Sequence, residues 1–543
     1  EWNKDDIDVL GFLKIDVLAL GMLTCIRKAF DLAKTHHDHP LTLASVPEDD
    51  KEVYEMIGHA DTIGVFQIES RAQQSMLPRL KPKNFYDLVI EVAIVRPGPI
   101  QGDMVHPYLR RRNGEEDPVY PSPELEKILE RTLGVPLFQE QAMKIAMVAA
   151  GFSAAEADEL RRSMATFKAP GQVTKFREKL VKGMVAKGYD AEFALRVFKQ
   201  LEGFGSYGFP ESHAASFALL VYVSSWLKYH YPDVFACALL NSLPMGFYQP
   251  AQIVTDARKH GVEVKAVDVN LSLWDNILEE KKGDYCPLRL GFRHIKGISQ
   301  EDVQQLIACR NTGYTTIHAL REAGVTLITL EKLADADAFR SMGLDRRKAL
   351  WEVSALHDRP IGIFTGQPSE SAAETQVQLP EMTLSEHVVH DYSTTSLSLK
   401  AHPVSFVREK LQLLHILSAK ELEGARNGAA VKVAGLVLVR QRPGTAKGVC
   451  FITIEDETGC SNLVVFQQQF TRYRKEILQA RLLMVEGTLQ REGEVVHVIV
   501  TGCYDLSKFL RRLLPSKATG MAMQPPKTEE IGATLFSEAR NFK

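Results

Sequence analysis

The sequence lacks the features that mark secreted, zinc-ribbon and membrane proteins. Its seven cysteines are scattered over 543 residues without a Cys-x-x-Cys pair, which argues against a zinc ribbon and a disulfide framework. The longest apolar run, 214–227, contains serines and is followed by Lys228 and His230, so it does not suit a membrane span. No signal peptide opens the chain, which begins with Glu1 and not Met. We expect a reducing cytoplasm, no membrane partner and, from the first residue, a portion of a longer protein.

The usual phosphate-binding signatures are also missing. No Gly-x-x-x-x-Gly-Lys-Ser/Thr string occurs, and the glycines between 203 and 208 do not follow a strand in the Gly-x-Gly-x-x-Gly spacing. A net charge of -3 hides any basic surface in the global balance, so basic residues must be judged locally. The length predicts about three or four domains. A Rossmann or P-loop enzyme is therefore not supported.

One carboxylate and one amine interrupt the apolar run 10–21. If 12–18 is a strand, residues two apart share a face, so Lys14 and Asp16 point the same way. That arrangement sets a cation beside a candidate metal ligand. Taken alone, an aspartate such as Asp16 is more often a helix cap or the ion-pair partner of its neighbouring lysine.

The segment 48–243 is mainly helical in pattern and carries most of the unusual polar residues. Arg71 ends the string Gly-Val-Phe-Gln-Ile-Glu-Ser-Arg, and Arg96 precedes a Pro-Gly-Pro turn that fixes its backbone. Gln139 leads into a predicted helix, 142–150, that Gly151 ends. These positions are candidates for a rigid polar pocket.

The next predicted helix begins with a capping box, Ser153 to Glu156. One turn later come Arg161 and Arg162, beside a predicted buried stripe of Ala157, Leu160 and Met164. Two guanidiniums fixed side by side suit a polyanion, because each can hold phosphate oxygens in a bidentate manner. The alternative is a pair of solvated surface arginines.

A glycine and aromatic string, 203–209, leads into a long helix that we predict to start at Ser212 as N-cap and to end near His230, before Pro232. His213 then lies in the first turn, where the helix dipole favours anions and a neutral imidazole. Taken singly, His213 is better explained as a neighbour of the cap than as a chemical participant.

Three histidines stand in the string 36–40, after a helix predicted from Gly21 to about Lys34. Because metal ligands usually converge from fixed elements, we interpret this string as a solvated linker. A hydrolase with a zinc ion on His36 to His39 is the alternative, and bound zinc would reveal it.

The strings LKIDVLALG, VFQIESR, VRPGP, FQEQ, ADELRRSM and YGFPESHAASFALL occur here in one order over the first 220 residues. Together they resemble the bacterial C-family DNA polymerases, that is, the DNA polymerase III alpha subunit family. The Pro210-Glu211 pair and the final string Ser537 to Lys543 resemble its error-prone, translesion-associated branch. The likeness covers nearly the whole chain.

The resemblance implies a DNA-directed DNA polymerase that uses two Mg²⁺ ions to add dNTPs to a primer. It assigns Asp16 to metal binding as a catalytic carboxylate, and Lys14, Arg161 and Arg162 to the triphosphate. It places Arg71, Arg96, Gln139 and His213 in the nucleotide-facing pocket. The family's other two aspartates come from an upstream Asp-x-Asp strand, and neither 6–8 nor 335–337 replaces it, so we expect binding without turnover from this chain.

The string 290–299 predicts the hairpin of a helix-hairpin-helix, followed by a helix from Gln300 to Cys309. Such hairpins present backbone N–H groups and a basic side chain to one phosphate, which makes Lys296, Gly297 and Ile298 candidate DNA contacts. A second helical pair, 330–357, turns at Gly343. A helical spacer is the alternative.

From 430 to 505 the apolar period changes to two, and five strand candidates appear, with the helix-like string 471–480 after the third. This is the order of an OB-fold, which often binds single strands through a basic, aromatic face. Arg440, Arg442, Lys447 and Phe451 are candidates for that face. A structural or protein-binding barrel is equally compatible.

The predicted fold class is therefore multidomain: mainly α-helical fingers with the last palm strand, a tandem helix-hairpin-helix, then an all-β OB-fold barrel. The predicted boundaries are palm end 1–25, fingers 26–265, helix-hairpin-helix 266–360, linker and connecting segment 361–428, OB-fold 429–506 and tail 507–543. Expected partners are primer-template DNA, dNTP, the sliding clamp and other translesion proteins, although the apolar string 360–364 lacks the leading Gln of a clamp-binding peptide. A non-catalytic DNA-binding or scaffold module is the competing class.

Overall fold

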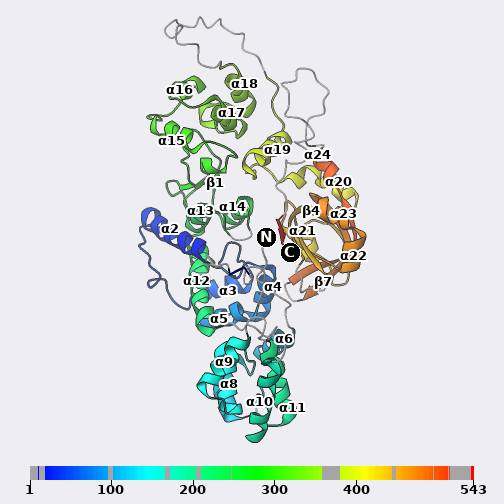
Figure 1. Ribbon diagram of the computed structural model, residues 1–543. Helices are drawn as coiled ribbons and strands as arrows, with labels where there is room; N and C mark the ends of the chain where they lie inside the picture. The colour runs from blue at the N-terminus through cyan, green and yellow to red at the C-terminus, as the bar shows by residue number, and fades with distance from the viewer. Residues whose placement is uncertain are drawn as a thin grey trace, which may run out of the picture.

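The computed structural model describes residues 10–11, 19–95, 102–120, 122–164, 172–203, 210–245, 248–356, 379–442, 448–492, 495–511, 513 and 540–542. Lys14, Asp16, Arg96 and Lys447, as well as the predicted palm strand, lie outside these residues. Figure 1 shows a helical body, a small helical lobe below it, a second helical region above it and a β-barrel at its side.

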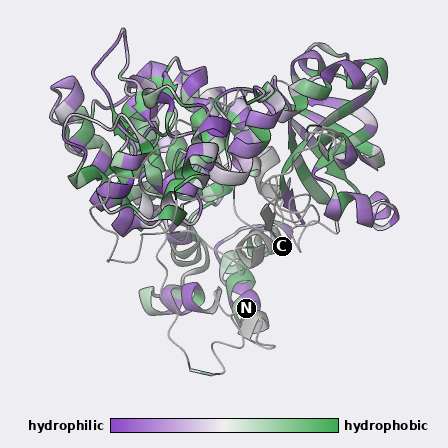
Figure 2. Ribbon diagram, turned by 90° about the horizontal axis from the view of Figure 1, so that it is seen from above, coloured by the Kyte–Doolittle hydropathy of each residue, from purple (hydrophilic) through white to green (hydrophobic). Residues whose placement is uncertain are grey.

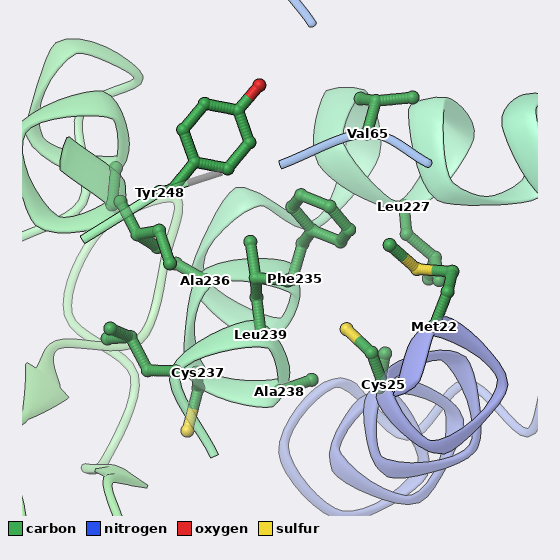
Figure 3. Packing of buried hydrophobic residues seen from close by; sticks show 14 of the residues in the cluster. Met22, Cys25, Val65, Leu227, Phe235, Ala236, Cys237, Ala238, Leu239 and Tyr248 are labelled. Carbon is green, nitrogen blue, oxygen red and sulfur yellow. The ribbon is translucent and has the colours of Figure 1, made fainter. Parts of the chain in front are cut away.

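The helical body is built around two buried helices. It comprises α2 (Leu20–His37), α3 (Lys51–Gly58), α4 (Arg71–Leu80), α5 (Phe85–Ile94), α6 (Gly102–Arg112), α12 (Glu211–His230), α13 (Pro232–Leu240) and α14 (Pro250–Lys259). Every residue of α13 is buried, and Figure 3 shows Phe235, Ala238 and Leu239 of this helix in one buried cluster with Met22 and Cys25 of α2. The apolar run 214–227 forms most of α12, and burial in this core explains its composition. None of the helices in the described ranges is long and apolar enough to cross a membrane.

The small lobe contains α7 (Pro123–Leu129), η1 (Glu130–Thr132), α8 (Gln139–Ala150), α9 (Ala154–Met164), α10 (Gln172–Ala186) and α11 (Ala191–Gly203). It has its own core, in which Ala146, Leu160 and Leu180 pack together. Gly151 ends α8 with φ 71°, as the sequence predicts. The predicted capping box is confirmed, because Ser153 N donates to Glu156 Oε2 at 3.0 Å and Glu156 N to Ser153 Oγ at 3.3 Å.

Several predicted helix boundaries were wrong. Helix α8 begins at Gln139 and not at residue 142. Pro210, not Ser212, is the N-cap of α12, because its backbone is extended and the next residue, Glu211, is already helical. Helix α2 continues to His37, so His36 and His37 belong to its last turn and not to a solvated linker. The side chain of His37 is only 7% exposed and contacts α13.

The region after the body combines a small sheet with paired helices. The sheet has the order β1-β3-β2, from β1 (Val264–Lys265), β2 (Ile277–Leu278) and β3 (Leu288–Arg289). After η3 (Phe292–His294) come α15 (Gln300–Ala308), α16 (Ile317–Glu322), α17 (Leu327–Asp335), η4 (Arg340–Met342) and α18 (Arg346–Ser354). Gly343 adopts φ 76° at the turn between the last two, where a side chain would be strained.

The described part of the segment between this region and the barrel is more folded than a linker. It contains α19 (Leu384–Thr395), η6 (Pro403–Val407), α20 (Arg408–Leu413) and α21 (Ala419–Gly424). Thr383, which lies inside the predicted linker and connecting segment, forms a capping box with Glu386 at the start of α19. The string 360–364 lies outside the described residues.

The barrel confirms the five predicted strands: β4 (Ala430–Gln441), β5 (Cys450–Glu455), β6 (Cys460–Val465), β7 (Leu482–Glu492) and β8 (Val495–Asp505). The order β5-β6-β8-β7-β4 closes through β4 and β5, and β6 runs parallel to β8. The predicted helix after β6 is two short helices, α22 (Gln467–Arg472) and α23 (Arg474–Gln479). Hydrophobic residues concentrate on these strands (Figure 2). The predicted fold class is confirmed, apart from the palm strand.

The chain's last described residues add to the barrel. Strand β9 (Arg540–Phe542) pairs in parallel with Val439 to Gln441, the half of β4 that lies beyond the β7 pairing. A cleft of about 430 Å³ lies beside this strand half, between barrel residues such as Val439 and Asn462 and body residues such as Asp61 and His260. The barrel and the helical body thus face each other across this cleft.

Candidate nucleotide and nucleic-acid site

The first turns of α8 and α12 meet at the junction of lobe and body. The backbone N–H of Glu211 donates to Glu140 Oε2 at 2.9 Å, and Tyr86 donates its hydroxyl to Glu211 Oε1 at 2.8 Å. The guanidinium of Arg131 lies 4.1 Å from the centre of the Tyr86 ring. Burial and the bond to Glu211 raise the pKa of Tyr86, which keeps it a donor. Two helix N-termini therefore face one junction.

Buried hydrogen bonds fix where α8 begins. Gln141 Oε1 accepts from the backbone N–H of Leu137 at 2.8 Å and of Phe138 at 3.1 Å. Its amide nitrogen donates to Thr132 Oγ1 at 2.9 Å and to Ile128 O at 3.1 Å. Because every polar atom of this side chain is used, the first turn of α8 is held rigidly.

Two of the predicted pocket residues belong to this junction. Gln139 is the first residue of α8 and is half-buried, and His213 is the third residue of α12 and is exposed. The His213 ring lies 4.2 Å from the Phe217 ring, which in turn meets Phe66 edge-on at 5.1 Å. An exposed imidazole on an aromatic support, at a helix N-terminus, suits a flat or anionic ligand.

The paired arginines lie on α9 in the small lobe. Both engage one carboxylate: Arg161 Nη2 is 2.8 Å from Asp158 Oδ1 and Arg162 Nη2 is 2.7 Å from Asp158 Oδ2. Their side chains are 40% and 75% exposed. Hydrogen bonding to Arg161 is the main reason that the pKa of Asp158 is lowered. Ala157 and Leu160 are buried as predicted, so the guanidiniums are presented outward on a fixed helix.

Two other predicted pocket residues are Arg71 and Arg96, of which Arg96 lies outside the described residues. Arg71 is the first residue of α4, which begins with a capping box of Ser70 and Gln73. The structure describes the backbone of Arg71 but not its side chain. Sequence reasoning missed Tyr86, Arg131, Glu140 and Glu211. The strings Phe-Gln-Glu-Gln and Pro-Glu-Ser-His contain the two glutamates, but only the fold brings them together.

The predicted phosphate-binding hairpin forms a tight turn before α15. Gly297 adopts φ 69°, and both it and Lys296 are exposed, whereas Ile298 is half-buried. The ammonium of Lys296 donates to Tyr392 O at 3.2 Å and Ser393 O at 2.9 Å, at the end of α19. Partial burial lowers its pKa. The hairpin is therefore anchored to α19 by the side chain that the sequence assigned to DNA.

The three described barrel candidates, Arg440, Arg442 and Phe451, differ in their exposure. Arg440 is buried and donates from Nε to Ile477 O at 2.6 Å and from Nη2 to Ala480 O at 2.5 Å, so its guanidinium holds the helices over the barrel. Arg442 is exposed, and its guanidinium lies 4.3 Å from the centre of the Phe470 ring. Phe451 is half-buried on β5, opposite Gln441 of β4. Arg442 and Phe451 are thus the described candidates with solvent access.

Three family models match the chain in sequence order. The bacterial DNA polymerase III alpha subunit finger domain matches residues 22–188. A helix-hairpin-helix motif matches 261–349, and an OB-fold nucleic acid binding domain matches 431–506. These three models cover most of the small lobe with part of the body, most of the paired helices, and the barrel.

Full-length relatives give the same picture. An error-prone DNA polymerase of Sinorhizobium medicae (strain WSM419) is 56% identical over 538 residues, covering 94% of this chain and 48% of the relative. One from Mesorhizobium japonicum is 53% identical over 572 residues, covering 100% of this chain and 51% of the relative. Error-prone DNA polymerase 2 of Agrobacterium fabrum is 54% identical, with 98% and 50% covered. The chain spans about half the length of these relatives.

Proposed function

Because the chain belongs to the bacterial DNA polymerase III alpha subunit family, we propose that the whole protein is an error-prone DNA-directed DNA polymerase that acts in translesion synthesis. The observation that carries this proposal is the identity of 53% to 56% to error-prone DNA polymerases over nearly the whole chain. The activity transfers a nucleotide from dNTP to a primer 3′-OH. This chain supplies the nucleotide-holding and DNA-holding half.

Phosphoryl transfer needs positioning and charge neutralisation more than covalent chemistry. Arg161 and Arg162 already hold one carboxylate between them, and a β,γ-phosphate pair is a larger anion with more acceptor oxygens. Exchange of Asp158 for the triphosphate would place both guanidiniums on it. Gln139 and His213, at the joined N-termini of α8 and α12, would face the same ligand, together with Arg71, Arg96 and Lys14.

Mg²⁺ is the cofactor that the proposed reaction needs, and two ions would neutralise the phosphates and activate the primer hydroxyl. Asp16 is the ligand we propose from this chain. The described carboxylates of the site fit the role less well, because Asp158 is taken by two arginines and Glu140 by the N-terminus of α12.

The DNA contacts that we propose are the hairpin 296–298 and the barrel surface at Arg442, Lys447 and Phe451. A guanidinium stacked on Phe470, beside a half-buried phenyl ring, offers charge and a flat face to an unpaired base. We leave Arg440 out, because its guanidinium is buried under α23. Primer-template DNA is the main partner; the sliding clamp and other translesion proteins, in the cytoplasm, follow from the family.

The test is dNTP binding to the 543-residue chain in the presence of Mg²⁺. Arg161→Ala removes charge-assisted bonds worth roughly 1.5–3 kcal/mol each, so affinity should fall by roughly tenfold or more. Arg340→Ala is the matched control, because Arg340 Nη2 also lies 2.8 Å from an aspartate three residues away, Asp337, with 48% exposure. It should leave dNTP affinity unchanged.

Primer extension completes the test. With Asp16 as the one catalytic carboxylate proposed here, this chain should bind primer-template DNA without adding nucleotides. Metal-dependent incorporation that Asp16→Ala abolishes would contradict that expectation. DNA binding with no measurable dNTP affinity, unaffected by Arg161→Ala, would favour the non-catalytic DNA-binding module instead.

A further inference from the structure

Three potential metal ligands converge where the helical body meets the small sheet. His37 is the last residue of α2, Asp233 is the second residue of α13, and Cys286 lies in the loop before β3. His37 Nε2 is 2.9 Å from Asp233 Oδ2 and 3.9 Å from Cys286 Sγ, and the three ligand atoms all lie within 4.8 Å of one another. Asp233 is fully buried, and Cys286 is 1% exposed.

The geometry is that of a single centre and not of a proton relay. In a Cys-His-Asp relay the thiol and the carboxylate bond to opposite nitrogens of the imidazole. Here Asp233 Oδ2 and Cys286 Sγ both face Nε2, so the ring cannot pass a proton from one to the other. Three ligand atoms that converge on one point instead suit a single cation bound between them.

The carboxylate itself is held but not fully satisfied. The backbone N–H of Cys286 donates to Asp233 Oδ2 at 2.7 Å, which fixes the carboxylate in the way that outer hydrogen bonds fix metal ligands. Its other oxygen, Oδ1, is buried and has no hydrogen-bond partner among the described residues. An unpartnered carboxylate oxygen inside a protein is costly, and a metal ion would give it a ligand role.

A second His and Asp cluster in the same molecule shows the contrasting solution. Asp61, Asp256 and His260 also come within ligand distance of one another. There the ammonium of the buried Lys228 lies 2.9 Å from Asp61 Oδ1 and 2.8 Å from Asp256 Oδ2, so the protein supplies its own cation. Among the described residues, the ion-pair partner of Asp233 is His37, and no lysine or arginine forms an ion pair with it.

We propose that His37, Asp233 and Cys286 form a structural site for a zinc-class divalent transition metal ion. An imidazole, a carboxylate and a thiolate are ligands that Zn²⁺ accepts, and Asp233 Oδ1 or a water molecule completes four-coordination. The site is separate from the proposed Mg²⁺ site, since a thiolate and an imidazole do not suit Mg²⁺. Because the ligands come from α2, α13 and the loop before β3, the ion would tie the small sheet to the helical body.

Cobalt substitution tests the site directly. The 543-residue chain is stripped with a chelator and titrated with Co²⁺, which reports thiolate ligation by a near-ultraviolet charge-transfer band. We expect one equivalent to bind with that band, Zn²⁺ to displace it, and Zn²⁺ to raise the melting temperature of the stripped chain. Cys286→Ser should abolish the band, and His37→Gln should weaken binding by at least about tenfold.

Matched variants separate this site from other thiols and histidines. Cys460→Ser, at an exposed cysteine of β6, and His260→Gln, in the lysine-filled cluster, should leave the band and the affinity unchanged. If Cys286→Ser does not fold, alkylation of the unaltered chain in partly denaturing urea gives the same answer: the buried Cys286 reacts only when the site opens, so one equivalent of Zn²⁺ should slow its alkylation. Absence of a thiolate band at one equivalent, or a band that persists in Cys286→Ser, overturns the proposal.

Discussion

Replacement of Arg346 tests how the paired helices are joined to the segment that precedes the barrel. Arg346 is the first residue of α18, and its side chain is fully buried. It donates from Nε to Asp335 O at 2.7 Å, from Nη1 to His387 O at 3.1 Å and from Nη2 to Asp391 Oδ1 at 2.5 Å. One guanidinium therefore connects α17, α18 and α19.

The cost of Arg346→Met follows from what each partner retains. Breaking a buried ion pair costs about 3–5 kcal/mol when the remaining charge is left alone. Asp391 keeps Lys400 Nζ at 3.1 Å and Ser398 Oγ at 2.7 Å, which lowers the cost, whereas two carbonyls lose a donor at about 1 kcal/mol each. We expect a loss of about 3 kcal/mol in the free energy of unfolding.

Denaturant unfolding, followed together with amide exchange in α17 to α19, measures this loss. Arg347→Met is the matched control, since Arg347 is the next residue, is 33% exposed and lies 3.6 Å from Glu386. It should cost less than about 1 kcal/mol, as exposed pairs do. The reasoning is refuted if Arg346→Met costs no more than Arg347→Met, or if exchange accelerates outside these three helices instead of within them.

Two further predictions concern the cleft between body and barrel. Hydrogen bonding to Asp61 raises the pKa of His260 above its usual 6.5, so the stability that this pair adds is present at low pH and is lost as pH rises through the raised pKa. The difference in unfolding free energy between the protein and His260→Gln should therefore shrink as the pH rises above about 6.5, and a difference that grows would contradict the assignment. Deletion of 540–543 removes the β9 partner of Val439 to Gln441. Amide exchange should then accelerate at the N–H groups of 439–441 that face β9, while those that face β5 and the segment 430–436, paired with β7, stay protected. Unchanged exchange throughout 439–441 would refute the pairing.

Regular patterns explain which parts of the fold the sequence could predict. Alternating apolar residues located every barrel strand, and the capping box at Ser153 located α9, because these signals are local. The roles of individual side chains were harder to predict from the sequence than the elements themselves. In the sequence, Arg440 looks like a loop arginine. Strand β4 continues to Gln441, however, and this places the guanidinium of Arg440 under α23. Its acceptors, Ile477 O and Ala480 O, are 37 and 40 residues away, and no local pattern reports them.

In the candidate nucleotide site, too, local patterns could be predicted from the sequence, whereas long-range contacts could not. The sequence identified Arg161 and Arg162 as a fixed pair, and the structure adds that Asp158 holds both. It could not predict that Glu140 meets the N-terminus of α12, 71 residues later, since that contact depends on how the lobe is attached to the body. Motif order therefore predicted the ligand class, whereas tertiary contacts decide which groups shape the pocket.

The histidine string at the C-terminal end of α2 shows how a local sequence pattern can mislead. As a local cluster, His36 to His39 suggested either a solvated linker or a metal site made from neighbouring histidines. The structure separates them: His39 Nδ1 meets the hydroxyl of Tyr231 at 2.6 Å, while His37 alone turns inward to Asp233. The other ligands of the proposed site come from residues 196 and 249 positions further along the chain. A metal site of this kind has no spacing signature, because its ligands are set by the packing of α2 against α13 and not by adjacency. The measurement that matters is therefore whether Cys286, rather than another histidine of the string, binds the metal.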